Sequence, residues 1–158
     1  MSAIAYRPPS AHTIAAAAQR SRNDPAYGAY LLLRVGFTAL PIVFGIDKFA
    51  NVLVHWDRYL APWLDGLSPF TAHNTMWIVG VVEIIAGLAV AIKPRYGSYI
   101  VTAWLAGIVI NLFTFPGFYD IALRDFGLML AALTLARLAN LFDPPWMRPA
   151  HGDAAPLR

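Results

Sequence analysis

Among the polar side chains in the apolar segments of this sequence, six could form one reactive or ligand-binding cluster. They are Asp47, Lys48, Glu83, Asn111, Arg124 and Asp125. An ionisable side chain inside a membrane is costly when it faces lipid, so it usually faces a helix bundle, where it pairs or marks an ion, proton or ligand site. The set holds three acids and two bases. We therefore expect a mutually neutralised cluster in which Glu83 pairs with Lys48 or Arg124.

Two uses of this cluster stay open, a purely structural clamp and a site for a ligand or a proton. For Asn111, a hydrogen bond between helices is the more common use. The chain has no cysteine, which excludes thiol–disulfide chemistry, iron–sulfur clusters and cysteine zinc sites. His55 and His73 fall in a loop, so we expect neither a metal site nor a haem held between helices. We expect no catalytic residue and no covalently bound cofactor.

The elements that must position the cluster are apolar helices. Of the 158 residues, 58% are hydrophobic and 13% are charged, against about 45–50% and about 25% in soluble domains. At about 1.5 Å per residue, roughly 20 residues cross a hydrocarbon core about 30 Å thick. Four segments have this character, 30–49, 76–92, 97–115 and 121–141. The sequence therefore predicts an all-α fold, an integral membrane four-helix bundle that forms one domain over 27–142.

Each predicted span carries a stripe of small and polar residues along one helix face. The stripes are Arg34, Thr38, Pro41, Gly45 and Lys48; Gly80, Glu83, Gly87 and Ala91; Ala103, Gly107 and Asn111; and Arg124, Gly127 and Ala131. Small residues let helix backbones approach, and polar residues bond across the contact. We expect the four stripes to meet in the core and the six polar residues to gather in its outer half. Arg34 and Arg137 are expected to extend to the membrane surface.

The flanking segments set the expected topology. Residues 1–26 and 143–158 are predicted to be disordered cytoplasmic tails, the first without a secretory signal and with one short helix near 13–20. Aromatic residues and prolines in 50–75 predict an interfacial cap with a short helix over 52–64. Lysine and arginine are concentrated in the tails and in the loop after the second span, which predicts cytoplasmic termini. The net charge is only +3, and the sequence contains no run of basic residues, so no nucleic-acid partner is expected.

Four short motifs appear in order along the spans: Leu33-Arg34-Val35-Gly36, Gly45-Ile46-Asp47-Lys48-Phe49, Gly80-Val81-Val82-Glu83-Ile84-Ile85-Ala86-Gly87, and Arg124-Asp125-Phe126-Gly127-Leu128-Met129-Leu130-Ala131. Over about 31–138 the chain resembles the DoxX-like family of small four-span bacterial membrane proteins. The resemblance implies a four-helix bundle in the bacterial cytoplasmic (inner) membrane. Some relatives are membrane subunits associated with quinone-linked sulfur oxidation or redox-stress complexes. By position, Lys48, Glu83, Arg124 and Asp125 would lie near a quinone or partner site.

Three functions compete. The first is a non-catalytic membrane subunit or anchor associated with a redox or quinone-linked complex, with membrane lipid and a redox protein as partners. The alternative is a small proton-coupled carrier in which Glu83 titrates, and because one chain offers few helices, this would require oligomerisation. An enzyme with Glu83 or Asp125 as general acid–base ranks last, since the sequence offers no nucleophile, metal or phosphate-binding motif.

Overall fold

The computed structural model describes residues 11–114 and 116–143, and these are helical with no strand. The elements are α1 (Ala11–Asn23), α2 (Pro25–Ala50), the 3₁₀ turn η1 (Trp56–Tyr59), α3 (Pro62–Leu67), α4 (Ala72–Ile92), α5 (Pro94–Phe113) and α6 (Tyr119–Phe142). Three of them, α2, α4 and α5, are long and apolar enough to cross a membrane. Helix α6 has 24 residues but includes two aspartates and two arginines. The fourth predicted span coincides with α6 and stays a prediction.

Local sequence signals explain where the helices begin and end. The Asp24 side chain accepts hydrogen bonds from the first amides of α2, and Pro25 occupies the first turn. Asn51 ends α2 in the left-handed conformation, with φ of 51°. Thr71 caps the start of α4, and Pro94 opens α5 directly after α4 ends. The helices therefore extend beyond most of the predicted span limits.

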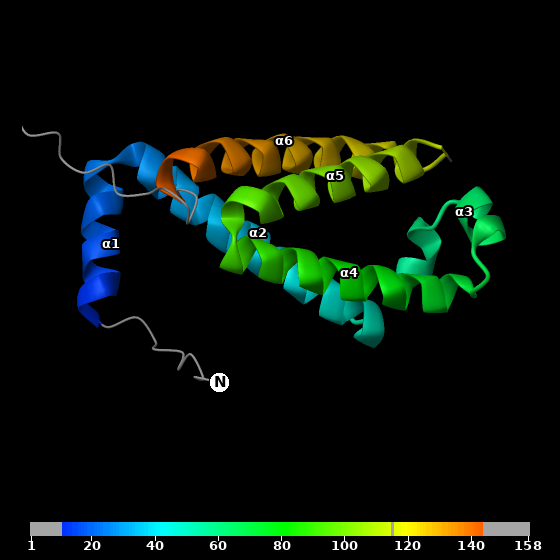
Figure 1. The fold of residues 1–158 in the computed structure, drawn as a ribbon. Coiled ribbons are helices and arrows are strands. Elements are labelled where there is room, and N and C mark those ends of the chain that lie inside the picture. Colours follow the sequence, from blue (N-terminus) through cyan, green and yellow to red (C-terminus); the bar gives the residue numbers. More distant parts are fainter. Residues whose placement is uncertain (1–10, 115, 144–158) are drawn as a thin grey trace, which may run out of the picture.

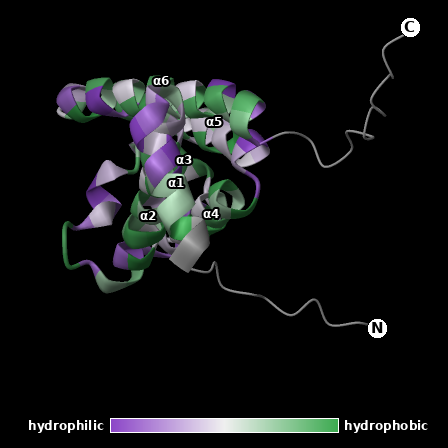
Figure 2. Ribbon diagram, turned by 90° about the vertical axis from the view of Figure 1, so that its left-hand side faces the viewer, coloured by the Kyte–Doolittle hydropathy of each residue, from purple (hydrophilic) through white to green (hydrophobic). Residues whose placement is uncertain are grey.

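The four long helices form two antiparallel hairpins, α2 with α4 and α5 with α6 (Figure 1). Seen along their length, the hairpins form two layers (Figure 2). They meet at a narrow end, where the Phe142 ring lies 5.3 Å from the Tyr27 ring and 5.5 Å from the Tyr30 ring. From there they splay apart toward a wide end, near which η1 and α3 lie (Figure 1). The molecule is therefore a wedge.

The α2–α4 hairpin is held by backbone contact at glycines. A Cβ atom added to Gly45 would lie 2.6 Å from the Gly80 carbonyl oxygen, and one added to Gly80 would lie 2.7 Å from the Gly45 oxygen. A Cβ atom added to Gly87 would lie 2.8 Å from the Thr38 oxygen. No side chain fits at such distances, so glycine is required at these positions. The first and second predicted stripes face each other here.

Most of the third and fourth stripes do not join them: only Ala131 packs against the core, so the expectation that all four stripes meet there is wrong. A Cβ atom added to Gly107 or Gly127 would have no neighbour within 4 Å, and both glycines are exposed. Helix α6 instead buries a row of Ala132, Ala136 and Ala139. Alanines at offsets of four and seven also form a small helix face, and burying that face leaves the glycines outside.

The flanking segments also differ from expectation. Helix α1 covers more of the N-terminal tail than the short helix predicted near 13–20. Between α2 and α4, η1 and α3 replace the single helix predicted over 52–64. The predictions for 1–10 and 144–158 lie outside the described residues. We use the name strap for residues 51–71, which connect the two helices of the first hairpin at the wide end.

Candidate functional site

A buried ion pair links the two helices of the first hairpin. Lys48 Nζ lies 2.7 Å from Glu83 Oε2, and the two side chains are 4% and 11% exposed. Because Gly45 and Gly80 bring the backbones into contact about one turn away, the two side chains are held together. The Lys48 ammonium also lies 3.7 Å from the centroid of the Trp56 ring, within cation–π range. The structure thus pairs Glu83 with Lys48 and not with Arg124.

Asp47 positions the strap beside this pair. Its carboxylate accepts hydrogen bonds from the amides of Val52 and Leu53, both at 3.1 Å. It also accepts one from the Trp56 indole Nε1 at 2.7 Å. These bonds turn the chain after α2 and place the Trp56 ring over Lys48. Asp47 therefore acts through Trp56 and the strap backbone and not as a second partner of Lys48.

Asn111 ties the strap to the second hairpin. Its Nδ2 donates to the Tyr59 carbonyl oxygen at 2.7 Å, and its Oδ1 accepts from the Ala61 amide at 2.9 Å. Nearby, Trp63 Nε1 donates to Thr114 Oγ1 at 2.8 Å. The strap therefore bridges the wide end of the wedge. The role of Asn111 is a tertiary hydrogen bond, the more common use expected for it, although its partner is a loop backbone and not a helix.

The two α6 residues of the predicted cluster lie differently. Arg124 is exposed and forms no ion pair with a carboxylate in the described part of the chain. Asp125 is half-buried and lies within electrostatic range of Lys48 and Glu83. The structure therefore brings Asp47, Lys48 and Glu83 together, sets Asp125 across from them, and leaves Asn111 and Arg124 apart.

A pocket of about 320 Å³ lies between the hairpins, at the lower end of the range of about 300–1,000 Å³ for small-molecule sites. Every long helix contributes to it: Leu32, Leu33, Gly36, Phe37, Leu40, Pro41 and Phe44 from α2, Glu83 and Ala86 from α4, Val101, Trp104, Leu105 and Ile108 from α5, and Leu128 and Ala131 from α6. Glu83 is the one charged residue among them. The pocket is thus an apolar space with a carboxylate in its wall.

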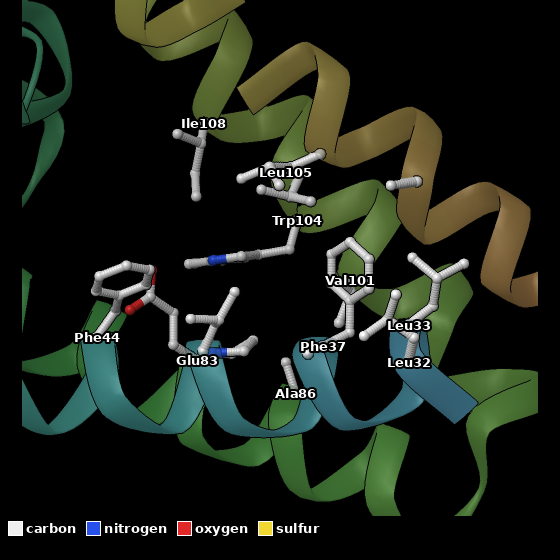
Figure 3. Close-up of a pocket in the computed structure, with 15 residues that line it drawn as sticks. Leu32, Leu33, Phe37, Phe44, Glu83, Ala86, Val101, Trp104, Leu105 and Ile108 are labelled. Atoms are coloured by element: carbon white, nitrogen blue, oxygen red, sulfur yellow. The ribbon is translucent and has the colours of Figure 1, made fainter. Parts of the chain in front are cut away.

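Trp104 is the functional candidate that the sequence reasoning missed. It extends from α5 toward Glu83 on α4, across the pocket (Figure 3). Its Nε1 is buried and makes no hydrogen bond with any described residue. The indole is close enough to interact with the Glu83 carboxylate, but the geometry is not that of a hydrogen bond. The sequence did carry one signal for it. Tryptophan is enriched at the membrane interfaces, so a tryptophan near the middle of a predicted span is unusual and indicates a specific role.

Arg34 departs from the expected extension to the membrane surface. Its Nη2 donates to the Ala91 carbonyl oxygen at 2.7 Å, and its Nη1 donates to the Tyr30 hydroxyl at 3.2 Å. The last carbonyls of a helix have no partner within the helix and carry partial negative charge, so a guanidinium is a favourable cap. Arg34 therefore stabilises the α4 terminus at the narrow end.

No family model, curated protein or solved structure matches the chain. The resemblance to the DoxX-like family thus stays a prediction that rests on the four motifs.

Proposed function

We propose that the chain crosses the bacterial cytoplasmic (inner) membrane four times, with both termini in the cytoplasm. Three helices are long and apolar enough to do so. Helix α6 supports a fourth crossing because it packs along α5 and exposes leucines: Leu123 is 69% exposed and Leu141 is 72% exposed. The basic residues of α1 and of the α4–α5 turn lie at the narrow end, which supports a cytoplasmic placement of that end (Figure 1).

Within that membrane we propose a non-catalytic subunit or anchor that holds a quinone-class lipophile for a redox complex. The observation that carries the proposal is the apolar pocket between the hairpins with a single charged group in its wall. A quinone has a planar apolar ring with polar oxygens on its rim. The aromatic side chains of Phe37, Phe44 and Trp104 match the ring, the Trp104 N–H can donate to a ring oxygen, and Glu83 can accept from a hydroxyl group of the reduced form. The DoxX-like resemblance supports a redox protein as the partner.

The wedge also supports an anchoring role. The α2–α4 hairpin is fixed by backbone contact and by a buried ion pair, and the strap ties it to α5 at the wide end. A site framed by such fixed elements can hold a ligand in one place. Such a subunit would present its ligand to a partner that supplies the redox chemistry.

The test compares two matched glycine variants. Gly36 lines the pocket and Gly107 does not, and an added Cβ would meet nothing within 4 Å at either position. Gly36→Phe should fill the pocket, whereas Gly107→Phe should extend outward.

Each tagged protein is purified in mild detergent, and co-eluting proteins and extracted lipophiles are identified by mass spectrometry. We expect quinone with the wild type and with Gly107→Phe, and about tenfold less with Gly36→Phe. A wild-type protein that elutes alone and without a lipophile would refute the proposal.

The second candidate is a proton-coupled carrier, which the buried Glu83 in the pocket wall favours. It ranks second because the carboxylate is already paired with Lys48 at 2.7 Å, and a proton on Glu83 would leave a buried cation without its partner. The carrier predicts flux in proteoliposomes that Glu83→Gln abolishes. Flux that is absent, or unchanged in Glu83→Gln, removes this candidate.

A further inference from the structure

A donor without a partner, Trp104 Nε1, and a carboxylate, that of Glu83, complement each other at the pocket wall. Trp104 Nε1 is a buried donor with no acceptor among the described residues. Glu83 Oε2 accepts a hydrogen bond from Lys48 Nζ at 2.7 Å. The Glu83 carboxylate also lies close to the Trp104 indole, without the geometry of a hydrogen bond. Figure 3 shows the two side chains pointing toward each other from opposite hairpins. Buried polar groups are nearly always hydrogen-bonded, so a buried donor without a partner beside a carboxylate points to a third group that binds both.

We infer that the pocket binds the hydroxyl group of a lipophilic alcohol or phenol, which accepts from Trp104 Nε1 and donates to Glu83. This inference rests on the proposed function, in which the pocket holds a quinone-class lipophile. A hydroxyl group carries both a donor and an acceptor, as this pair of atoms requires. It would join the two hairpins through one ligand atom.

A ketone and an ammonium group each satisfy only one of the two side chains. A ketone oxygen can accept from the indole but cannot donate to the carboxylate, and its lone pairs would face those of Glu83. An ammonium group can donate to Glu83 but cannot accept from the indole, and it would place a second cation near Lys48. Sites built to bind a hydroxyl group discriminate strongly against analogues that lack it, because their polar groups are then left unpaired. The pocket should therefore prefer a hydroquinone to the corresponding quinone.

The rest of the ligand must be apolar. Leu32 and Leu40 line the pocket on α2 and are 75% and 48% exposed, so the pocket opens on an apolar outer face. A hydrocarbon tail can leave between them into the bilayer. Hydroxyl groups on such tails have two sources, a reduced quinone and a lipid alcohol, and both present the same head-group chemistry.

The experiment measures binding of three probes: decylhydroquinone under anaerobic conditions, its dimethyl ether and farnesol. Native mass spectrometry of the detergent-solubilised full chain gives the bound fraction at matched concentrations. In the wild type we expect decylhydroquinone to bind about tenfold more tightly than its ether, since one charge-assisted hydrogen bond is lost. Farnesol bound as well as decylhydroquinone would identify a lipid alcohol as the source, and farnesol bound as weakly as the ether would identify the quinol.

Two variants test the assigned atoms. Trp104→Phe keeps an aromatic ring and removes the N–H, and it should weaken decylhydroquinone binding about fivefold, the effect of one neutral hydrogen bond. Trp77→Phe is the matched control, since Trp77 is 42% exposed and does not line the pocket. It should bind as the wild type does. Glu83→Gln keeps the side-chain shape and an acceptor for Lys48, and it should reduce the preference for the hydroquinone over the ether.

The outcomes separate this inference from the proposed function. If the hydroquinone and the ether bind the wild type equally and Gly36→Phe blocks both, the pocket holds a lipophile but a bound hydroxyl group is refuted. Equal binding to the wild type and to Trp104→Phe refutes the indole as the donor. If no probe binds the wild type, the inference is refuted, and the proposed function is refuted as well only if the purified wild type also carries no quinone.

Discussion

The α2–α4 and α5–α6 hairpins share an antiparallel form, but different chemistry holds each together. In the first, Gly45 and Gly80 bring two backbones into contact, and Lys48 and Glu83 close the interface with a buried ion pair. In the second, α6 buries alanines and Leu135, while Gly107 and Gly127 face outward. Both sequences are rich in small residues, so composition alone does not distinguish them.

The two kinds of interface differ in how much change they tolerate. A backbone contact between glycines leaves no space for a side chain, and a buried ion pair fails when either partner is removed. An interface of alanine and leucine loses stability gradually as volumes change. The first hairpin is therefore the fixed wall of the pocket, and the second supplies the apolar wall that carries Trp104.

The largest effect is expected from breaking the ion pair on one side. Glu83→Leu leaves the Lys48 ammonium buried without its partner, which costs about 3–5 kcal/mol of stability. Replacing both residues, in Lys48→Met with Glu83→Leu, should restore most of the loss because no unpaired charge remains. Thermal unfolding in detergent measures both variants. A double variant as unstable as Glu83→Leu would show that the pair itself, and not the stranded charge, controls stability.

Next comes the glycine contact. Gly80→Val places a branched side chain where an added Cβ already lies 2.7 Å from the Gly45 oxygen. Forcing the helices apart should cost about 1–3 kcal/mol. Gly127→Val on α6 is the matched control, because its Cβ meets nothing within 4 Å. Comparing the two melting temperatures isolates the packing effect from the shared cost of valine in a helix, and equal temperatures would contradict the contrast between the hairpins.

The bridge between the hairpins should have a smaller effect. Asn111→Ala removes the hydrogen bonds to Tyr59 and Ala61. Each is expected to contribute about 0.5–1.5 kcal/mol. The strap amides should then exchange hydrogen for deuterium faster, while amides at the narrow end are unchanged. Uniformly faster exchange along the whole chain would indicate global destabilisation instead of local release of the strap.

The smallest effect should be a gain. Gly107 lies inside α5 with open space around it, so Gly107→Ala should stabilise the protein by up to about 1 kcal/mol through helix propensity. A lower melting temperature would show that the outward face of α5 packs against something in the purified protein. Cross-linking would then identify that contact.

Much of the fold could be predicted from the sequence because apolar length is sufficient to locate a membrane helix. The predicted spans 30–49 and 76–92 fall inside α2 and α4, and caps outside the apolar run, such as Asp24 and Thr71, account for the added residues. The Lys48–Glu83 pair was among the two alternatives because a buried charge needs a partner. Whether Glu83 pairs with Lys48 or with Arg124 depends on how α6 is rotated about its own axis. Hydropathy does not specify that rotation.

The remaining features depend on which helix face turns inward. Glycine and alanine stripes both allow close packing, so the pattern did not show that Ala132 and Ala136 would be buried while Gly127 stayed outside. Trp104 was overlooked because an apolar aromatic residue in a span carries no charge signal. The strap contacts of Asn111 involve main-chain atoms, and sequence patterns do not reveal such partners.

The hydrogen bonds of Asn111 to the strap determine which sequence changes this segment can accept. Its amide binds a carbonyl and an N–H of the main chain, and every residue type except proline offers both groups. Substitution of Tyr59 by another residue would therefore leave these hydrogen bonds intact. Insertion or deletion of one residue between Asn51 and Tyr59 would instead shift the matching groups out of reach. The number of residues in this segment should thus be more tightly constrained than the identity of its side chains.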